Sequence, residues 1–125
     1  MIGSYLYDKM TNDATITALV GTNIYPDFGV YGSTPFIVYM TLSEDRNRIT
    51  RSPAVTIKGV ADTRPGVVAL NKAIYDLFND ALADIKETYL TNYIDGITII
   101  NNIEALYDSD NEKWQCSTDI IIDYH

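Results

Sequence analysis

Residues 67–85 read VVALNKAIYDLFNDALADI, and this stretch decides the fold that the sequence predicts. Its apolar residues recur every three or four positions, which is the spacing of a helix with one buried face. They are Val67, Leu70, Ile74, Leu77, Phe78, Ala81 and Ile85. Thr63 and Pro65 just upstream are helix-start signals. Polar residues such as Lys72 and Asp76 occupy the opposite face, so we expect a helix that lies on a sheet with one side in water.

Four strands are predicted around this helix. Residues 36–42 form a β-branched and aromatic run, and residues 54–61, 97–107 and 113–124 alternate between apolar and polar positions. Strands that follow one another along a chain pair antiparallel, and one long helix covers a single face of the sheet. The sequence therefore predicts an α+β fold. It is a two-layer sandwich in the order α-β-β-α-β-β, with an antiparallel four-stranded sheet and a long helix on one face.

The N-terminal segment accounts for the first helix in this order. Residues 2–10 and 14–20 each place apolar residues on one helical face, and Gly21 stands where a glycine would end the second stretch. We find no repeat or low-complexity linker and expect a single domain over residues 1–125. Two segments are expected outside regular elements, an extended connector over residues 22–34 and a long basic hairpin loop over residues 43–52.

Composition and charge exclude several classes of protein. The 125 residues carry 9 Lys and Arg against 17 Asp and Glu, a net charge of -8, which argues against a nucleic-acid binder and an anionic membrane surface as partner. The hydrophobic fraction of 46% excludes intrinsic disorder. A single cysteine, Cys116, cannot form an intramolecular disulfide, which fits a reducing compartment such as the cytosol. No apolar run approaches the roughly 20 residues of a membrane span, so no membrane partner is expected.

The residues that usually carry chemistry are sparse. The single histidine, His125, is the last residue, and Cys116 falls on an apolar strand face that predicts a buried, inert thiol. Asp108, Asp110 and Glu112 are spaced like the start of a calcium loop but lack its later glycine and glutamate, which favours a solvated hairpin tip. Nucleotide-binding and nucleophile-elbow motifs are missing. We therefore expect no enzyme, no cofactor and no metal.

Charge and aromatic residues provide the candidate interaction surface. Five of the nine basic residues lie in one stretch: Arg46, Arg48, Arg51, Lys58 and Arg64. This stretch is either a solvated loop or an arm that docks on the acidic surface of another subunit, because arginine binds carboxylates in a fixed fork. Ten tyrosines against three phenylalanines fit either a sheet-rich protein or a half-wet interface. The candidate interface residues are Arg46, Arg48 and Arg51 of the loop and Tyr25, Phe28 and Tyr31 of the connector.

Several runs of the N-terminal half resemble the tail completion, or tail terminator, proteins of long-tailed bacteriophages and prophages. They are Leu6, Asn12-Asp13-Ala14, Ile16, Ala18-Leu19-Val20-Gly21, Ile24-Tyr25-Pro26 and Thr34-Pro35-Phe36-Ile37-Val38. The order of the later strands and helix is similar to that family as well. The resemblance implies a non-enzymatic virion protein that completes or terminates the tail at its head-proximal end and joins it to the head. It also implies assembly in the host cytoplasm as a homo-oligomeric ring, commonly a hexamer.

The same resemblance implies the partners. They would be other copies of the chain, the tail tube protein and the head–tail connector proteins, with DNA passing through the ring without specific binding. An acidic channel repels phosphates, so the net charge is compatible with such a passage. The alternative function is a small-molecule-binding or regulatory α+β domain, in which helix and sheet form a pocket.

Overall fold

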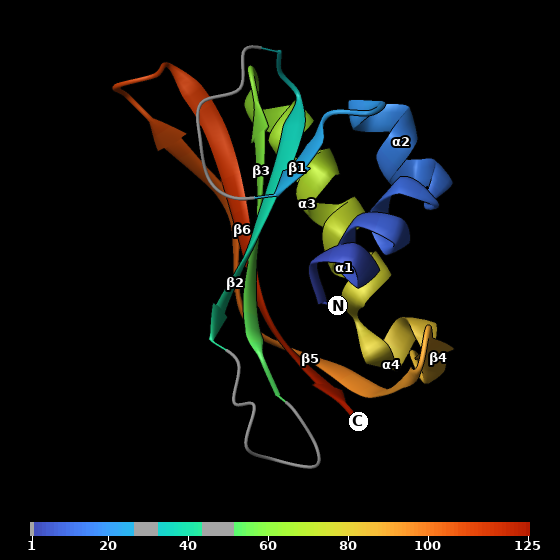
Figure 1. Ribbon diagram of the computed structural model, residues 1–125. Helices are drawn as coiled ribbons and strands as arrows, with labels where there is room; N and C mark the ends of the chain where they lie inside the picture. Colours follow the sequence, from blue (N-terminus) through green and yellow to red (C-terminus); the bar gives the residue numbers. More distant parts are fainter. Residues whose placement is uncertain (1, 27–32, 44–51) are drawn as a thin grey trace.

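A computed structural model describes residues 2–26, 33–43 and 52–125. The elements follow one another as α1 (Ile2–Thr11), α2 (Ala14–Val20), β1 (Ile24–Pro26), β2 (Phe36–Ser43), β3 (Ala54–Ala61), α3 (Arg64–Phe78), α4 (Asp80–Ala83), β4 (Glu87–Tyr89), β5 (Asn92–Asp108) and β6 (Lys113–Tyr124). Figure 1 shows the sheet curling around the helices, which lie together on one side of it. None of the helices in the described part of the chain is long and apolar enough to cross a membrane.

Within the described ranges the sheet has six strands, in the order β1-β2-β3-β6-β5-β4. β1 pairs parallel with β2, and every other neighbouring pair is antiparallel. The sheet is therefore mixed, and it forms a curled half-barrel. β5 changes register against β6 at three points, next to Ile94, Ile99 and Ile103. Bulges of this kind bend a strand and increase its twist, which accounts for the strong curvature of β5 in Figure 1.

The predicted antiparallel four-stranded sandwich in the order α-β-β-α-β-β is wrong. β1 and β4 are missing from the prediction because three residues are too few to show an alternating pattern. β1 is parallel to β2, which sequential hairpins do not produce. The single long helix is wrong as well, because α3 ends at Phe78 and the short helix α4 follows.

Capping side chains set the ends of these helices. Thr63 accepts a hydrogen bond from the backbone N–H of Gly66 at 3.1 Å and begins α3. Asn79 has extended backbone angles, and its side chain accepts from the N–H of Ala81 at 3.1 Å. The same residue therefore ends α3 and begins α4, which interrupts the apolar pattern that predicted one helix.

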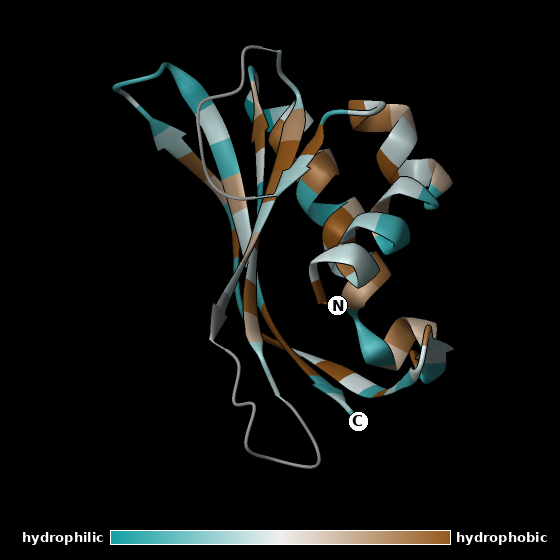
Figure 2. Cartoon of the chain, viewed as in Figure 1, coloured by the Kyte–Doolittle hydropathy of each residue, from teal (hydrophilic) through white to brown (hydrophobic). Residues whose placement is uncertain are grey.

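The core lies between the concave face of the sheet and helices α1, α2 and α3. Figure 2 shows hydrophobic segments on the central strands and on the helices that face them. Ile57 of β3, Leu70 and Ile74 of α3 and Ile120 of β6 are essentially without solvent exposure. Gly59 of β3 lets α3 approach closely, since a Cβ there would lie 2.6 Å from Cδ2 of Leu70. The helix layer is thus fixed tightly against β3 and β6.

Candidate functional site

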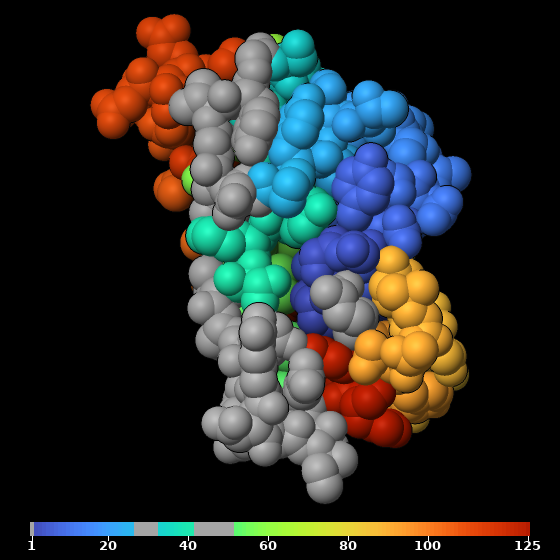
Figure 3. Space-filling model, in the orientation of Figure 1, coloured from blue at the N-terminus to red at the C-terminus, as the bar shows by residue number. Residues whose placement is uncertain are grey.

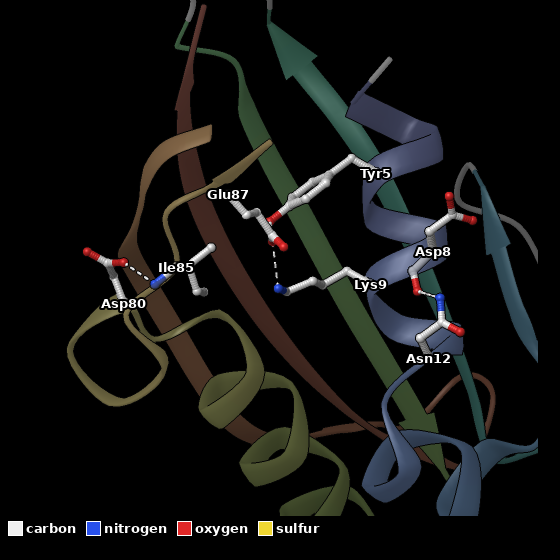
Figure 4. Close-up of polar contacts among 7 residues, drawn as sticks. All are labelled: Tyr5, Asp8, Lys9, Asn12, Asp80, Ile85 and Glu87. Atoms are coloured by element: carbon white, nitrogen blue, oxygen red, sulfur yellow. Dashed lines mark hydrogen bonds and ion pairs between the residues drawn. The ribbon is translucent and has the colours of Figure 1, made fainter. Parts of the chain in front are cut away.

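A polar cluster joins the first helix to the short edge strand. Tyr5 and Lys9 lie one turn apart on α1, and both reach Oε1 of Glu87 on β4, at 2.8 Å from the tyrosine hydroxyl and 2.7 Å from the lysine Nζ (Figure 4). The hydroxyl of Tyr89 donates to Oδ2 of Asp8. The rings of Tyr5 and Tyr89 meet edge to face, with centroids 5.3 Å apart. These five residues, Tyr5, Asp8, Lys9, Glu87 and Tyr89, form what we call the α1–β4 cluster.

Contacts in the turn before β4 hold this strand in position for its contact with α1. Oδ1 of Asp80, at the start of α4, accepts a hydrogen bond from the N–H of Ile85 at 2.8 Å (Figure 4). Asp84 adopts a left-handed conformation with φ of 48°, which turns the chain after α4. Ile85 is buried in the core. The segment that leads into β4 is therefore fixed, and Glu87 points toward α1.

The electrostatics of the cluster favour one protonation state. Burial raises the pKa of Tyr5 well above its usual range, and the hydrogen bond to Glu87 raises it further. Burial also raises the pKa of Glu87, but the hydrogen bonds from Lys9 and Tyr5 outweigh it and leave that pKa below its usual value. Tyr5 is thus a neutral donor and Glu87 a charged acceptor around neutral pH. A pair held in this way connects α1 to β4.

A hollow of about 440 Å³ lies over the cluster. It is lined by Tyr5, Asp8, Lys9, Asn12, Asp13, Leu77, Glu87 and Tyr89. A second hollow of about 260 Å³ shares Lys9, Asp13 and Leu77 and extends toward α3. Each hollow is lined by more acidic side chains than basic ones, since Lys9 is the one basic residue in either lining. The two hollows would therefore favour a cation over an anion. Among the described residues, no group of three His, Cys, Asp or Glu side chains is placed to hold a metal ion.

The predicted interface residues are only partly described. Tyr25 lies in β1 and is half-buried; its hydroxyl donates to Oδ1 of Asn23 at 3.0 Å, and its ring meets that of Phe36. The other candidates lie outside the described residues: Phe28, Tyr31, Arg46, Arg48 and Arg51. The connector and loop hypothesis therefore stays a prediction.

The residues considered for chemistry lie in three separate surroundings. Cys116 is buried, and burial raises the pKa of its thiol to about 11, as expected for an inert cysteine. His125 is exposed, with Nδ1 at 2.8 Å from Oδ2 of Asp95. Asp108 accepts hydrogen bonds from the backbone N–H of Asp110 and the side chain of Asn111 within the β5–β6 turn. These bonds are those of a solvated turn.

A further surface lies on the outer half of the β5–β6 hairpin. Four large apolar side chains in this outer half of β5 are exposed, with exposed fractions of 54% for Ile100, 40% for Ile103, 53% for Leu106 and 48% for Tyr107. Ile103 and Leu106 also line a hollow of about 250 Å³ on the sheet, together with Lys58 of β3. Figure 3 shows the tip of this hairpin projecting from the body of the molecule at the upper left.

The sequence contained only half of the signal for the α1–β4 cluster. Tyr5, Asp8 and Lys9 are spaced to share one face of a helix, and this spacing is the part of the signal that the sequence contains. Their partners Glu87 and Tyr89 lie about eighty positions away in a strand that the pattern did not predict. Their contact follows from tertiary packing alone.

Comparisons with known proteins address the fold. No protein-family model matches the chain, and no curated protein sequence matches it. A chain in the structure described as the virion of a native gene transfer agent particle has a similar fold, with a TM-score of 0.61 and 15% sequence identity. The aligned region covers 95% of this chain and 90% of that chain. At this identity the likeness shows a shared fold over nearly the whole length of both chains.

Proposed function

We propose that this chain is a non-enzymatic structural protein of a phage-like virion, which completes or terminates the tail and joins it to the head. The observation that carries the proposal is the fold shared with a chain of a gene transfer agent virion over 95% of the residues. The N-terminal runs that resemble tail completion proteins support the finer role at the head-proximal end of the tail.

The charged, thiol and apolar groups of the described residues fit a protein that acts by binding other proteins. The α1–β4 cluster holds its charged groups in a fixed ion pair, and the buried thiol of Cys116 is protonated at neutral pH. Exposed apolar side chains gather instead on β5, where a partner would cover them. These features support an assembly role for the chain and no catalytic one.

The working form in this proposal is a closed ring of identical subunits, commonly six, in which each contact is head-to-tail. The ring would bind the tail tube on one side and connector proteins on the other, and DNA would pass through it. The net charge of -8 supports a channel that repels phosphates. Arg46, Arg48 and Arg51 remain the proposed docking arm toward an acidic surface of the neighbouring subunit.

Electron microscopy of particles assembled without this chain tests the proposal. We expect filled heads and separate tails in place of joined particles, and purified protein added back should restore joining. The add-back distinguishes a missing joint from a general assembly defect. Normal yields of joined particles in the absence of the chain would overturn the proposal.

A small-molecule-binding domain is the second candidate, and the hollow of about 440 Å³ at the α1–β4 cluster favours it. Its mixed lining, with Lys9 already paired to Glu87, would suit a small cationic ligand. Thermal shifts of the purified protein against a panel of small amines would test this function. A ligand that stabilises the wild-type protein but not Glu87→Gln would support it.

A further inference from the structure

In the part of the chain that the structure describes, one edge of the sheet is long and has no pairing strand. β4 pairs only with Asn92, Tyr93 and Ile94 at the start of β5. From residue 95 to residue 108, β5 has β6 on one side and no strand on the other among the described residues. The backbone groups on this side form a template for another strand. We call residues 95–108 of β5, on the side away from β6, the β5 edge.

Natural proteins usually protect such an edge with lysine, proline or a very short strand. β5 contains no lysine, arginine or proline, and residues 96–103 read GITIINNI without any charge. Short uncharged segments of high β-propensity are those that pair with other chains. The protective features present are the three register shifts, which bend the edge, and the charges of Asp95, Glu104 and Asp108. The uncharged stretch between Asp95 and Glu104 is therefore the part of the edge that is open to another strand.

The side chains along this edge add an apolar contact. Ile100, Ile103, Leu106 and Tyr107 are between 40% and 54% exposed. Four large apolar side chains in one strand exceed the scattered single residues that are normal on a monomer. A strand placed against the β5 edge would lie beside Ile103 and Leu106 on one face of the sheet and beside Tyr107, whose ring meets that of Trp114, on the other. It would form backbone hydrogen bonds at the same time.

The opposite end of the same sheet has a short open segment of β2 that can pair with the β5 edge of a second copy. β1 pairs only with residues 37–39 of β2, so residues 40–43 of β2 have no described strand on that side. Counting along the sheet, β2 and β5 run in opposite directions. If the sheets of two copies were placed side by side, β2 of one copy would lie antiparallel to β5 of the next. The same step repeated from copy to copy is a head-to-tail contact, which closes into a ring when the rotation allows it.

The distribution of charge favours pairing of β2 with the β5 edge over a twofold-symmetric pairing of two β5 edges. β5 carries Asp95, Glu104 and Asp108, and it has no basic residue to balance them. Two β5 edges facing each other would bring six carboxylates together, which is unfavourable. β2 reads FIVYMTLS and has no charged residue, so it can approach the β5 edge without repulsion.

We propose that the β5 edge is covered by the β2 end of the sheet of a second copy of this chain, so that the sheet continues from subunit to subunit. This inference rests on the proposed ring and names its subunit contact. It assigns Ile100, Ile103 and Leu106 to that contact, and it predicts that the amides of the β5 edge become hydrogen-bonded on assembly.

A double variant with a matched control tests the contact. Ile100→Lys with Leu106→Lys places two charges on the β5 edge. Leu82→Lys with Leu90→Lys places two charges on side chains that are more exposed, at 67% and 72%, and lie in α4 and in the β4–β5 turn, outside residues 95–108. All three proteins are first compared by circular dichroism and urea denaturation, so that a folding defect is recognised. Light scattering and negative-stain microscopy then measure ring formation, alone and on tail tubes.

We expect rings from the wild type and the control pair, and loss of rings from the β5 edge pair at unchanged stability. Hydrogen exchange on wild-type rings should slow in residues 95–108 by about tenfold or more relative to the monomer. If the β5 edge pair forms rings as well as the wild type, or if exchange in residues 95–108 is the same in ring and monomer, the inference is wrong while the proposed function stands. If the wild type forms no ring even on tail tubes, the proposed ring is wrong, and the subunit contact that rests on it is wrong as well.

Discussion

Gly59 in the middle of β3 provides a sharp test of how α3 rests on the sheet. Gly59→Ala adds a Cβ that would lie 2.6 Å from Cδ2 of Leu70 and 2.8 Å from Sγ of Cys116. Ordinary contacts between such atoms are about 3.5–4.0 Å. Leu70 and Cys116 are each only 1% exposed, so neither side chain can turn toward solvent to make room. We therefore expect the substitution to strain the contact between α3 and β3.

Two opposing effects set the magnitude. Extra methyl groups in a packed core cost about 1–3 kcal/mol. Alanine in a strand regains about 0.5–1 kcal/mol over glycine, because its backbone is less free in the unfolded chain. The free energy of unfolding of Gly59→Ala should therefore fall by about 1–2 kcal/mol. With a urea dependence of about 1–3 kcal/mol per molar, the midpoint should drop by roughly 0.3–2 M.

Equilibrium urea denaturation followed by tryptophan fluorescence and circular dichroism measures this change. Gly3→Ala is the control, since a Cβ at Gly3 in α1 meets nothing within 4 Å; it should leave stability unchanged or higher. In the background Leu70→Ala, the close contact with Leu70 is removed while that with Sγ of Cys116 remains, so Gly59→Ala should lose part of its cost there. Wild-type stability of the single variant Gly59→Ala would show that α3 can shift, and the tight contact would be refuted.

Three further predictions concern a cap, an ion pair and a thiol. Thr63→Ala removes the cap of α3 and should lower the free energy of unfolding by about 1 kcal/mol in urea. The folded-state pKa of Glu87 lies below its ordinary 4.5, so its stabilising contribution is present above pH 4.5 and is lost as the pH falls through the folded value. Wild-type stability should therefore fall more steeply below pH 4.5 than that of Glu87→Gln, and parallel pH curves would contradict this. Cys116, with a pKa of about 11, should react with iodoacetamide at pH 8 far more slowly in the native than in the urea-unfolded protein, as mass spectrometry can measure.

The sequence predicts the central strands well because their pattern is local. Residues 54–61 and 113–124 are β3 and β6 as predicted, and residues 36–42 fall one residue short of β2. β3 and β6 each have one face against the helices and one face away from them, which produces the alternation. In β2 the consecutive residues 36–39 are all buried, which produces the continuous apolar run. The helix of residues 67–85 fails at Asn79, where a capping side chain overrides a continuous apolar spacing.

The edge strands could not be predicted for a different reason. β1 and β4 have three residues each, and they exist because a neighbouring strand supplies their hydrogen bonds. Glu87 and Tyr89 therefore show no local signal, although both belong to the α1–β4 cluster. The interface hypothesis for Phe28, Tyr31 and the arginines of residues 46–51 falls on residues outside those described.

β5 combines a central part that the sequence predicts with an irregular course that it does not predict. The sequence predicts a strand over residues 97–107, but β5 extends from Asn92 to Asp108 and has three register shifts. Each shift breaks the alternation, so no single period describes the strand. The shifts at Ile99 and Ile103 border the positions of the exposed Ile100 and Leu106, and bulges are known to re-aim side chains in this way. The irregularity that weakens the sequence signal is thus the feature that turns apolar side chains outward, at the edge where we place the neighbouring subunit.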